Sequence, residues 1–214
     1  MRTHPHRRTT GTAVRQRRTQ AERVDAMRAR LLDATIELLA KNGWARLSTN
    51  DVVRRARVSR GALAHHFPTK AALMEAAAER LIEQRAAEFE TVFLALSPEQ
   101  RTVDHALDLL WSYFQGPAFA AMLELTVAAR TNRDLRGVLA DGPERITDAA
   151  YAVFVDLFPD VANNPFAPQG LRVAFSLMAG MALQAVVDGD RRGHHAESLA
   201  MLKALAAALL PGNG

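Results

Sequence analysis

The stretch from Ser48 to Lys70, STNDVVRRARVSRGALAHHFPTK, predicts two short helices joined by a tight turn at Arg57 and Val58. Ser48 or Thr49 can cap the first helix, whose apolar residues recur at the spacing of one helix face: Val52, Val53 and Ala56. Two short helices joined in this way form the helix-turn-helix plan, which places its second helix in the major groove of DNA.

The second helix is expected over residues 60–66, because Ser59 is placed to cap it and Pro68 disfavours helical geometry at Phe67. Thr69 can cap a third helix that begins at Lys70. A long helix therefore leaves the helix-turn-helix directly.

Charge is distributed unevenly along the chain. Residues 1–70 hold 16 Lys and Arg against 5 Asp and Glu, whereas residues 71–214 hold 11 against 18. This division predicts a basic, polyanion-binding N-terminal unit attached to an acidic body that does not share that partner.

The first 42 residues divide into an arm and a helix. Residues 1–20 contain six arginines, two histidines and no acidic residue, and we interpret them as a disordered basic arm. Two roles stay open for this arm: contact with DNA, or a solvated tail. A helix follows over residues 20–41, and Asn42 and Gly43 end it. Its apolar stripe is Val24, Met27, Leu31, Thr35 and Leu38.

Beyond Lys70 the pattern predicts helices only, at about 70–96, 99–114, 118–131, 133–157, 171–187 and 195–210. The helix over 133–157 stays open to a break near Pro143, because proline is tolerated only in the first turn of a helix. The apolar face of the first of these helices is expected at Leu73, Ala77, Leu81, Ala87 or Glu88, and Val92. The predicted fold class is all-α, with a three-helix helix-turn-helix domain over residues 21–69 and a C-terminal helical domain over residues 70–214.

The last two helices predict a homodimer. Residues 171–187 are apolar almost all round, and a helix without a polar face is buried on several sides. Together with the final helix they form half of a four-helix interface that a second copy would complete, although packing within one monomer is the alternative. The expected interface residues are Leu171, Phe175, Gly180, Leu183, Leu199, Leu202, Leu205 and Leu209.

Composition narrows the class of protein. Cysteine is absent, which excludes disulfides and thiolate metal sites. The chain has no unbroken run of 18 apolar residues and no apolar signal core after its basic start, so we expect a cytoplasmic protein without a membrane partner.

The sequence does not predict an enzyme. The motifs G-x-S-x-G, Walker loop and H-E-x-x-H are absent, and there is no cysteine nucleophile. His194 and His195 lie near Asp188, Asp190, Arg191 and Arg192, but such a stretch usually connects helices, and neither a metal nor a cofactor is predicted. Asp104 and Asp108 lie one helical turn apart, as is common on solvated faces.

The segment from Ala26 to Leu81 resembles the TetR (tetracycline-repressor-like) family of bacterial transcription regulators. The likeness is carried by Gly43, by Ala56 and by the block V-S-x-G-x-L-x-x-H-F-x-x-K over residues 58–70. Residues 123–136 are also similar to many family ligand domains. The resemblance implies an all-helical homodimer that represses promoters and is released by a small ligand.

The resemblance also implies roles for single residues. Arg60, Gly61 and Ala62 would face base edges, with Asn50 as a further candidate, and the guanidinium of Arg60 would bond a guanine. Phosphate contacts would come from Thr49, Ser59, His66 and Lys70, and the DNA-binding set also includes Ser48, Arg57 and His65. For Arg54 and Arg55, phosphate contact and a solvated face both stay open.

Two positions depart from the family pattern. Arg57 stands where the family usually has glycine, and a left-handed residue with a side chain costs roughly 1–2 kcal/mol there. An added phosphate contact would be the gain. Ala64 stands where the family often has a tyrosine that touches the DNA backbone, and His65 or the basic arm is expected to replace that contact.

A small, largely apolar ligand is expected in the C-terminal domain, although a stripe of aromatic and methionine residues at helical spacing is more often plain core. The candidate lining residues are Trp111, Phe114, Met122, Phe154, Phe175 and Met178, with Glu124, Arg130 or Gln184 as polar anchors. The alternative function is a nucleoid-type or adaptor protein that binds DNA with little sequence preference and has no effector.

Overall fold

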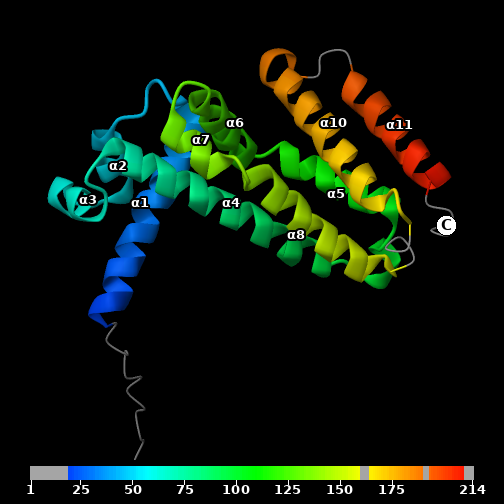
Figure 1. Ribbon diagram of the computed structural model, residues 1–214, viewed down its shortest axis with the longest axis horizontal. Helices are drawn as coiled ribbons and strands as arrows, with labels where there is room; N and C mark the ends of the chain where they lie inside the picture. The colour runs from blue at the N-terminus through cyan, green and yellow to red at the C-terminus, as the bar shows by residue number, and fades with distance from the viewer. Residues whose placement is uncertain (1–18, 160–163, 190–192, 210–214) are drawn as a thin grey trace, which may run out of the picture.

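The computed structural model describes residues 19–159, 164–189 and 193–209, and this part of the chain contains helices and no strand (Figure 1). The all-α prediction is confirmed. Most of the predicted basic arm lies outside the described residues, as do Asp190, Arg191 and Arg192. The helices are α1 (Gln20–Asn42), α2 (Thr49–Ala56), α3 (Arg60–His66), α4 (Lys70–Leu94), α5 (Val103–Phe114), α6 (Pro117–Ala129), α7 (Arg133–Leu139), α8 (Gly142–Leu157), α10 (Ala167–Asp188) and α11 (His194–Leu209), with a short 3₁₀ turn, η1 (Pro98–Gln100), before α5.

Side-chain caps start the helices of the DNA-binding end where the sequence predicts them. The hydroxyls of Ser48, Ser59 and Thr69 each accept a hydrogen bond from the backbone N–H three residues ahead, at 3.2, 3.1 and 3.0 Å. At the end of α1, Gly43 has a φ of 76° and donates its N–H to the carbonyl of Leu39. These local bonds fix the boundaries of α2, α3 and α4.

Boundaries in the rest of the chain differ from prediction in two places, and the break left open near Pro143 is present. α5 begins at Val103 and not at residue 99, because Thr102 caps it and η1 precedes it as a separate turn. The helix predicted over 133–157 is divided into α7 and α8, with Pro143 in the first turn of α8. α10 begins at residue 167, earlier than predicted, with Pro168 in the first turn, where its missing N–H is not needed.

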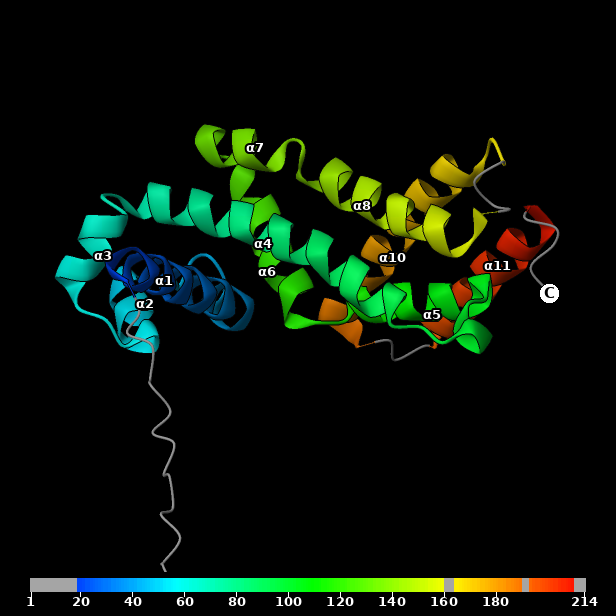
Figure 2. The same ribbon diagram turned by 90° about the horizontal axis from the view of Figure 1, so that it is seen from below.

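The helices form two groups joined by α4. Figure 1 shows α1, α2 and α3 at one end of the molecule and α10 and α11 at the other. α4 runs from the first group into the second and lies beside α8 in both views (Figures 1 and 2). One continuous helix therefore links the helix-turn-helix to the C-terminal helices.

Two clusters of buried side chains hold these groups together. The first cluster is formed by α1 to α4 together with α6 and α7, and its buried residues include Leu31, Leu39 and Leu125. The second is formed by the later part of α4 with α5, α8, α10 and α11. α6 and α7 therefore pack on the DNA-binding end, although they follow α4 and α5 in the sequence.

The buried stripe of α4 differs from prediction in its second half. Leu73, Ala77 and Leu81 are buried as expected. Beyond them, Ala87, Glu88 and Val92 are exposed. The stripe instead continues at four-residue spacing through Arg85, Phe89 and Phe93. A charged side chain thus occupies a position on the apolar stripe.

By length and composition, the stretch Ala167–Val187 of α10 could cross a membrane, with a mean hydropathy of 1.6. Arg172 and other polar residues interrupt the stretch, so it is not an unbroken apolar run. Ala174, Met178 and Ala182 of this helix are buried in the second core.

Candidate DNA-binding and ligand-binding sites

The recognition helix α3 presents one arginine beside small residues. The side chain of Arg60 is exposed, and no described residue forms a hydrogen bond or ion pair with it. A Cβ on Gly61 would meet only the Ser59 hydroxyl, at 3.9 Å, so packing within the protein does not require this glycine. Gly61 is exposed and Ala62 is half-buried, and both leave space for a close approach to α3.

Two neighbouring arginines are already occupied by acidic partners. Arg54 forms an ion pair with Asp51 one turn earlier in α2. Arg55 donates from Nε to Glu37 of α1 at 2.8 Å. These contacts fit a solvated face for both residues. Arg57 and Arg60, the two arginines of the predicted DNA-binding set, have no acidic partner among the described residues.

Arg57 has the left-handed conformation expected from its place in the turn. Its φ and ψ are 55° and 49°, and among the described residues it is the only one other than glycine with a positive φ. Arg30 of α1 donates to the carbonyls of Ala56 and Arg57, the latter at 3.3 Å. These bonds hold the backbone of the turn, while the side chain of Arg57 is exposed.

Lys70 begins α4 and is bonded to the loop before α2. Its Nζ donates to the carbonyl of Leu47 at 2.8 Å and lies 5.7 Å from the centre of the Trp44 ring. An ammonium has three N–H donors, so two remain for a phosphate. In the same loop the side chain of Arg46 is exposed and has no described partner. Arg46 was not among the predicted DNA-binding residues.

The other predicted DNA-binding residues lie at the same end of the molecule. Ser48 and Thr49 are half-buried at the start of α2, and Asn50 is exposed beside them. On α3, His65 is exposed and His66 is half-buried, with their ring centres 5.6 Å apart in an edge-on arrangement.

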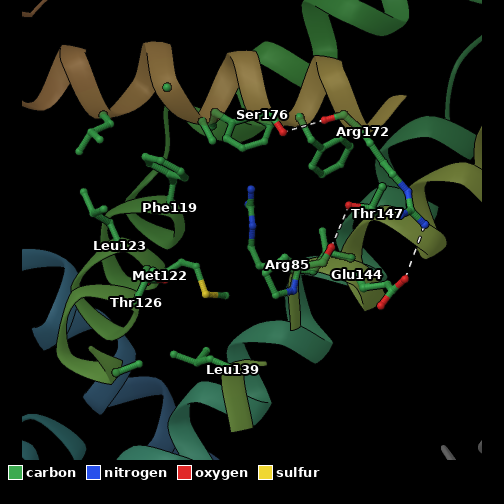
Figure 3. A pocket seen from close by; sticks show the side chains of 18 of the residues that line it. Arg85, Phe119, Met122, Leu123, Thr126, Leu139, Glu144, Thr147, Arg172 and Ser176 are labelled. Atoms are coloured by element: carbon green, nitrogen blue, oxygen red, sulfur yellow. Dashed lines mark hydrogen bonds and ion pairs between the residues drawn. The ribbon is translucent and has the colours of Figure 1, made fainter. Parts of the chain in front are cut away.

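A cavity of about 940 Å³ lies among α4, α5, α6, α7, α8 and α10. Figure 3 shows Phe119, Met122 and Thr126 of α6 on one side of it and Glu144 and Thr147 of α8 on the other. The volume lies within the range of small-molecule sites, roughly 300–1,000 Å³.

Half of the predicted lining residues are found there. Phe114, Met122 and Phe175 line the cavity, and so does Arg130. Trp111 lines a neighbouring cavity of about 520 Å³ instead. Two further residues lie elsewhere, because Phe154 is half-buried against the second core and Met178 is fully buried in it: neither lines the large cavity.

Arg85 is a charged, buried lining residue that sequence reasoning missed. Its guanidinium donates from Nη1 to Glu88 at 2.6 Å and from Nη2 to the carbonyl of Tyr113 at 2.5 Å, and it stacks on the Tyr113 ring. Burial lowers the pKa of Arg85 and raises the pKa of Tyr113 well above its ordinary value. The phenol of Tyr113 is therefore neutral and donates to the backbone carbonyl of Arg85 at 3.1 Å.

Comparison with known proteins identifies the family. The profile of bacterial regulatory proteins of the tetR family matches residues 31–77, which include the helix-turn-helix. Over 181 residues the chain is 32% identical to the HTH-type transcriptional regulator CymR of Pseudomonas putida, a match that covers 82% of this chain and 87% of CymR. This chain belongs to the TetR family. It is a DNA-binding transcriptional regulator.

Solved structures of other proteins share the fold of this TetR-family chain. The crystal structure of a transcriptional regulator from Rhodococcus sp. Rha1 matches with a TM-score of 0.65 at 22% identity, covering 85% of this chain and 96% of that one. The multidrug binding protein EbrR, crystallised in complex with imidazole, matches with a TM-score of 0.57 at 26% identity, covering 87% and 91%.

The regulator exposes many apolar side chains on its last two helices. On α10 and α11 they are Val173, Leu177, Leu183, Val186, Val187, Met201, Leu205 and Leu209. Among the predicted interface residues, Leu183, Leu205 and Leu209 are about half exposed and Gly180 is exposed, whereas Leu171, Phe175 and Leu199 are half-buried. Leu202 is only 8% exposed and packs into the monomer's own core, which leaves little of it for a partner.

The side chain of Glu124 on α6 bonds to the loop after α1 and does not line the cavity. Its carboxylate accepts the backbone N–H of Trp44 at 2.7 Å, just after α1. A Cβ on Gly43 would lie 3.1 Å from the same carboxylate. Met122 and Thr126 of the same helix line the cavity, so α6 touches both sites.

The acidic pair of α5 has a structural partner. Lys203 of α11 lies 2.9 Å from the carboxylate of Asp104 and 2.8 Å from that of Asp108. Burial lowers the pKa of Lys203, but the two carboxylates raise it by a larger amount, so the pKa is raised overall. These ion pairs fasten α11 to α5.

Proposed function

We propose that this regulator is a homodimeric repressor that leaves a pseudopalindromic operator when a small, largely apolar ligand occupies the 940 Å³ cavity. The observation that carries the proposal is the path of α4. This helix begins at Lys70, four residues after the recognition helix ends, and contributes Arg85 to the cavity wall. That the solved relative EbrR is described as a multidrug binding protein supports a ligand-binding role for the cavity.

The proposed DNA contacts divide into two kinds. Arg60 reads a base, because its guanidinium is exposed, has no described partner and lies beside small residues on α3. Lys70 and Arg57 bind phosphates, as do the hydroxyls of Thr49 and Ser59. The remaining predicted DNA-binding residues, Asn50, His65 and His66, keep their proposed places on the same face.

The proposed dimer joins α10 and α11 of two copies. The exposed apolar side chains of these helices need a covering surface, and a symmetric four-helix interface supplies one. The two recognition helices would then enter major grooves about 34–36 Å apart. In this proposal residues 21–69 form the DNA-binding domain, residues 70–214 form the ligand-binding and dimerisation domain, and the protein works in the cytoplasm.

The proposed switch changes the separation of the two recognition helices. A ligand that prefers a different position of α4 tilts this helix and moves both α3 helices out of register, while each helix-turn-helix stays folded. Such a coupling of about 1–3 kcal/mol lowers operator affinity roughly 5- to 150-fold.

Sequencing the DNA fragments that the protein retains at physiological salt tests the proposed function. A pseudopalindromic sequence enriched among them is the expected result. Salt-dependent retention without sequence preference would instead identify a nucleoid-type protein and overturn the repressor proposal.

A further inference from the structure

We propose that the effector carries an anionic group, such as a carboxylate, that binds Arg85, and an apolar body that fills the rest of the cavity. The inference rests on the proposed ligand-binding function of this cavity.

The charge of the cavity wall is opposite to that of the domain around it. Residues 71–214 hold 18 acidic side chains against 11 basic ones. The cavity nevertheless has four arginines in its wall and a single acidic residue, Glu144. Three of these arginines, Arg130, Arg136 and Arg172, are exposed, and only Arg172 lies near Glu144, at 3.6 Å. An anion in the cavity therefore meets a positive surface.

Arg85 is the one arginine of this wall that is buried. It is only 5% exposed, and burying a cation costs several kcal/mol unless a partner and hydrogen bonds offset it. Its one acidic partner, Glu88, has a side chain that is 46% exposed, so water screens this ion pair. Two of the five guanidinium N–H donors are used, and no described residue accepts from the other three.

The surroundings of Arg85 define the rest of the ligand. Figure 3 shows Arg85 in the middle of the view, with Phe119, Met122 and Leu139 around the same space. A carboxylate paired with the guanidinium in this setting gains a charge-assisted hydrogen bond. The apolar side chains then require an apolar body, which excludes small, fully hydrated anions such as phosphate.

A pair of fluorescent probes separates the charge from the apolar body. 8-Anilinonaphthalene-1-sulfonate and N-phenyl-1-naphthylamine share one aromatic skeleton and differ only by the sulfonate. Each is titrated into the full-length wild type and into the variants Arg85→Met, Glu88→Gln and Arg145→Met. Arg145 is the matched control, because it pairs with Glu79 at 2.7 Å outside the cavity and its loss changes the net charge equally. Circular dichroism checks that each variant is folded.

We expect Arg85→Met to weaken the sulfonate probe about 10- to 100-fold and the neutral probe less than about threefold. Glu88→Gln should strengthen the sulfonate probe, because it removes the competing carboxylate, and Arg145→Met should change neither probe. A purely structural Arg85–Glu88 pair predicts losses in both variants. If Arg85→Met does not fold, Glu88→Gln decides alone, and unchanged or weaker sulfonate binding overturns the inference.

The same titration separates this inference from the proposed function. Equal wild-type affinity for the two probes overturns the anionic group and leaves the ligand cavity standing. Binding of neither probe to the wild type overturns both.

Discussion

Replacing Arg57 with glycine should stabilise the protein and lower its affinity for DNA. Arg57 has a φ of 55°, and a left-handed residue with a side chain costs roughly 1–2 kcal/mol. Glycine removes this strain but adds about 0.5–1 kcal/mol of chain entropy to the unfolded state. The net expected gain is therefore about 0.5–1 kcal/mol. The bonds from Arg30 to the two turn carbonyls involve only the backbone of residue 57, so the turn keeps its geometry in the variant.

The expected loss of DNA affinity comes from removing the Arg57 side chain. If each Arg57 of a dimer neutralises one phosphate, Arg57→Gly lowers the slope of log K against log salt by about 1.8, since each phosphate contributes about 0.9. Thermal unfolding should show a Tm higher by about 1–4 °C for a chain of this size. Operator binding at several salt concentrations measures the slope.

Two controls separate the effects in Arg57→Gly. Arg57→Lys keeps both the strain and the charge, so its Tm and salt slope should stay near the wild-type values. Arg57→Asn removes the charge but tolerates the left-handed conformation, and it should lose the same slope as Arg57→Gly. A lower Tm for the glycine variant would refute the strain argument, and an unchanged slope would refute the phosphate contact.

Three further outcomes follow from the proposed function. Lys70→Ala should weaken binding to all DNA sequences alike, whereas Arg60→Ala should relax base choice at one position. Selection from a random DNA library would show the difference, and identical behaviour of the two variants would contradict this division of roles. Gly180→Leu should weaken the dimer without unfolding the monomer, because nothing lies within 4 Å of a Cβ there, and sedimentation of the wild type as a monomer at micromolar concentration would argue against the interface. A ligand that releases the operator should bind roughly 5- to 150-fold more weakly when operator is present, by linkage, and equal affinity in both titrations would mean that this ligand operates no such switch.

The sequence was most informative where structure depends on neighbours in the chain. The caps at Ser48, Ser59 and Thr69 bond to N–H groups three residues ahead, and such bonds depend on local residue types. The family's glycine at the position of Arg57 likewise raised the left-handed conformation that this residue has. These features fix the three helix starts and the turn of the DNA-binding end.

The cavity depends on contacts between distant segments, and its residues were predicted less well. Phe114 and Phe175 line it while Met178 is fully buried, yet all three are apolar residues on predicted helices. Helical periodicity gives the buried face of a helix but not which part of that face meets a void. Arg85 did have a local signal, because it lies four residues after Leu81 and four before Phe89 on one buried stripe. The sequence prediction continued the buried stripe from Leu81 to Ala87 or Glu88, and it therefore passed over Arg85.

The position of α6 indicates how small a displacement the proposed switch requires. Met122 and Glu124 are two residues apart and therefore point to nearly opposite sides of the helix, one to the cavity and one to the backbone N–H of Trp44. A displacement of α6 by a ligand acts on this hydrogen bond directly. Hydrogen bonds to a charged group contribute about 1.5–3 kcal/mol. A coupling between ligand and operator is typically about 1–3 kcal/mol. The Glu124 hydrogen bond is thus of the same size as the coupling, so a displacement of α6 that accompanies the proposed tilt of α4 requires no unfolding of either core.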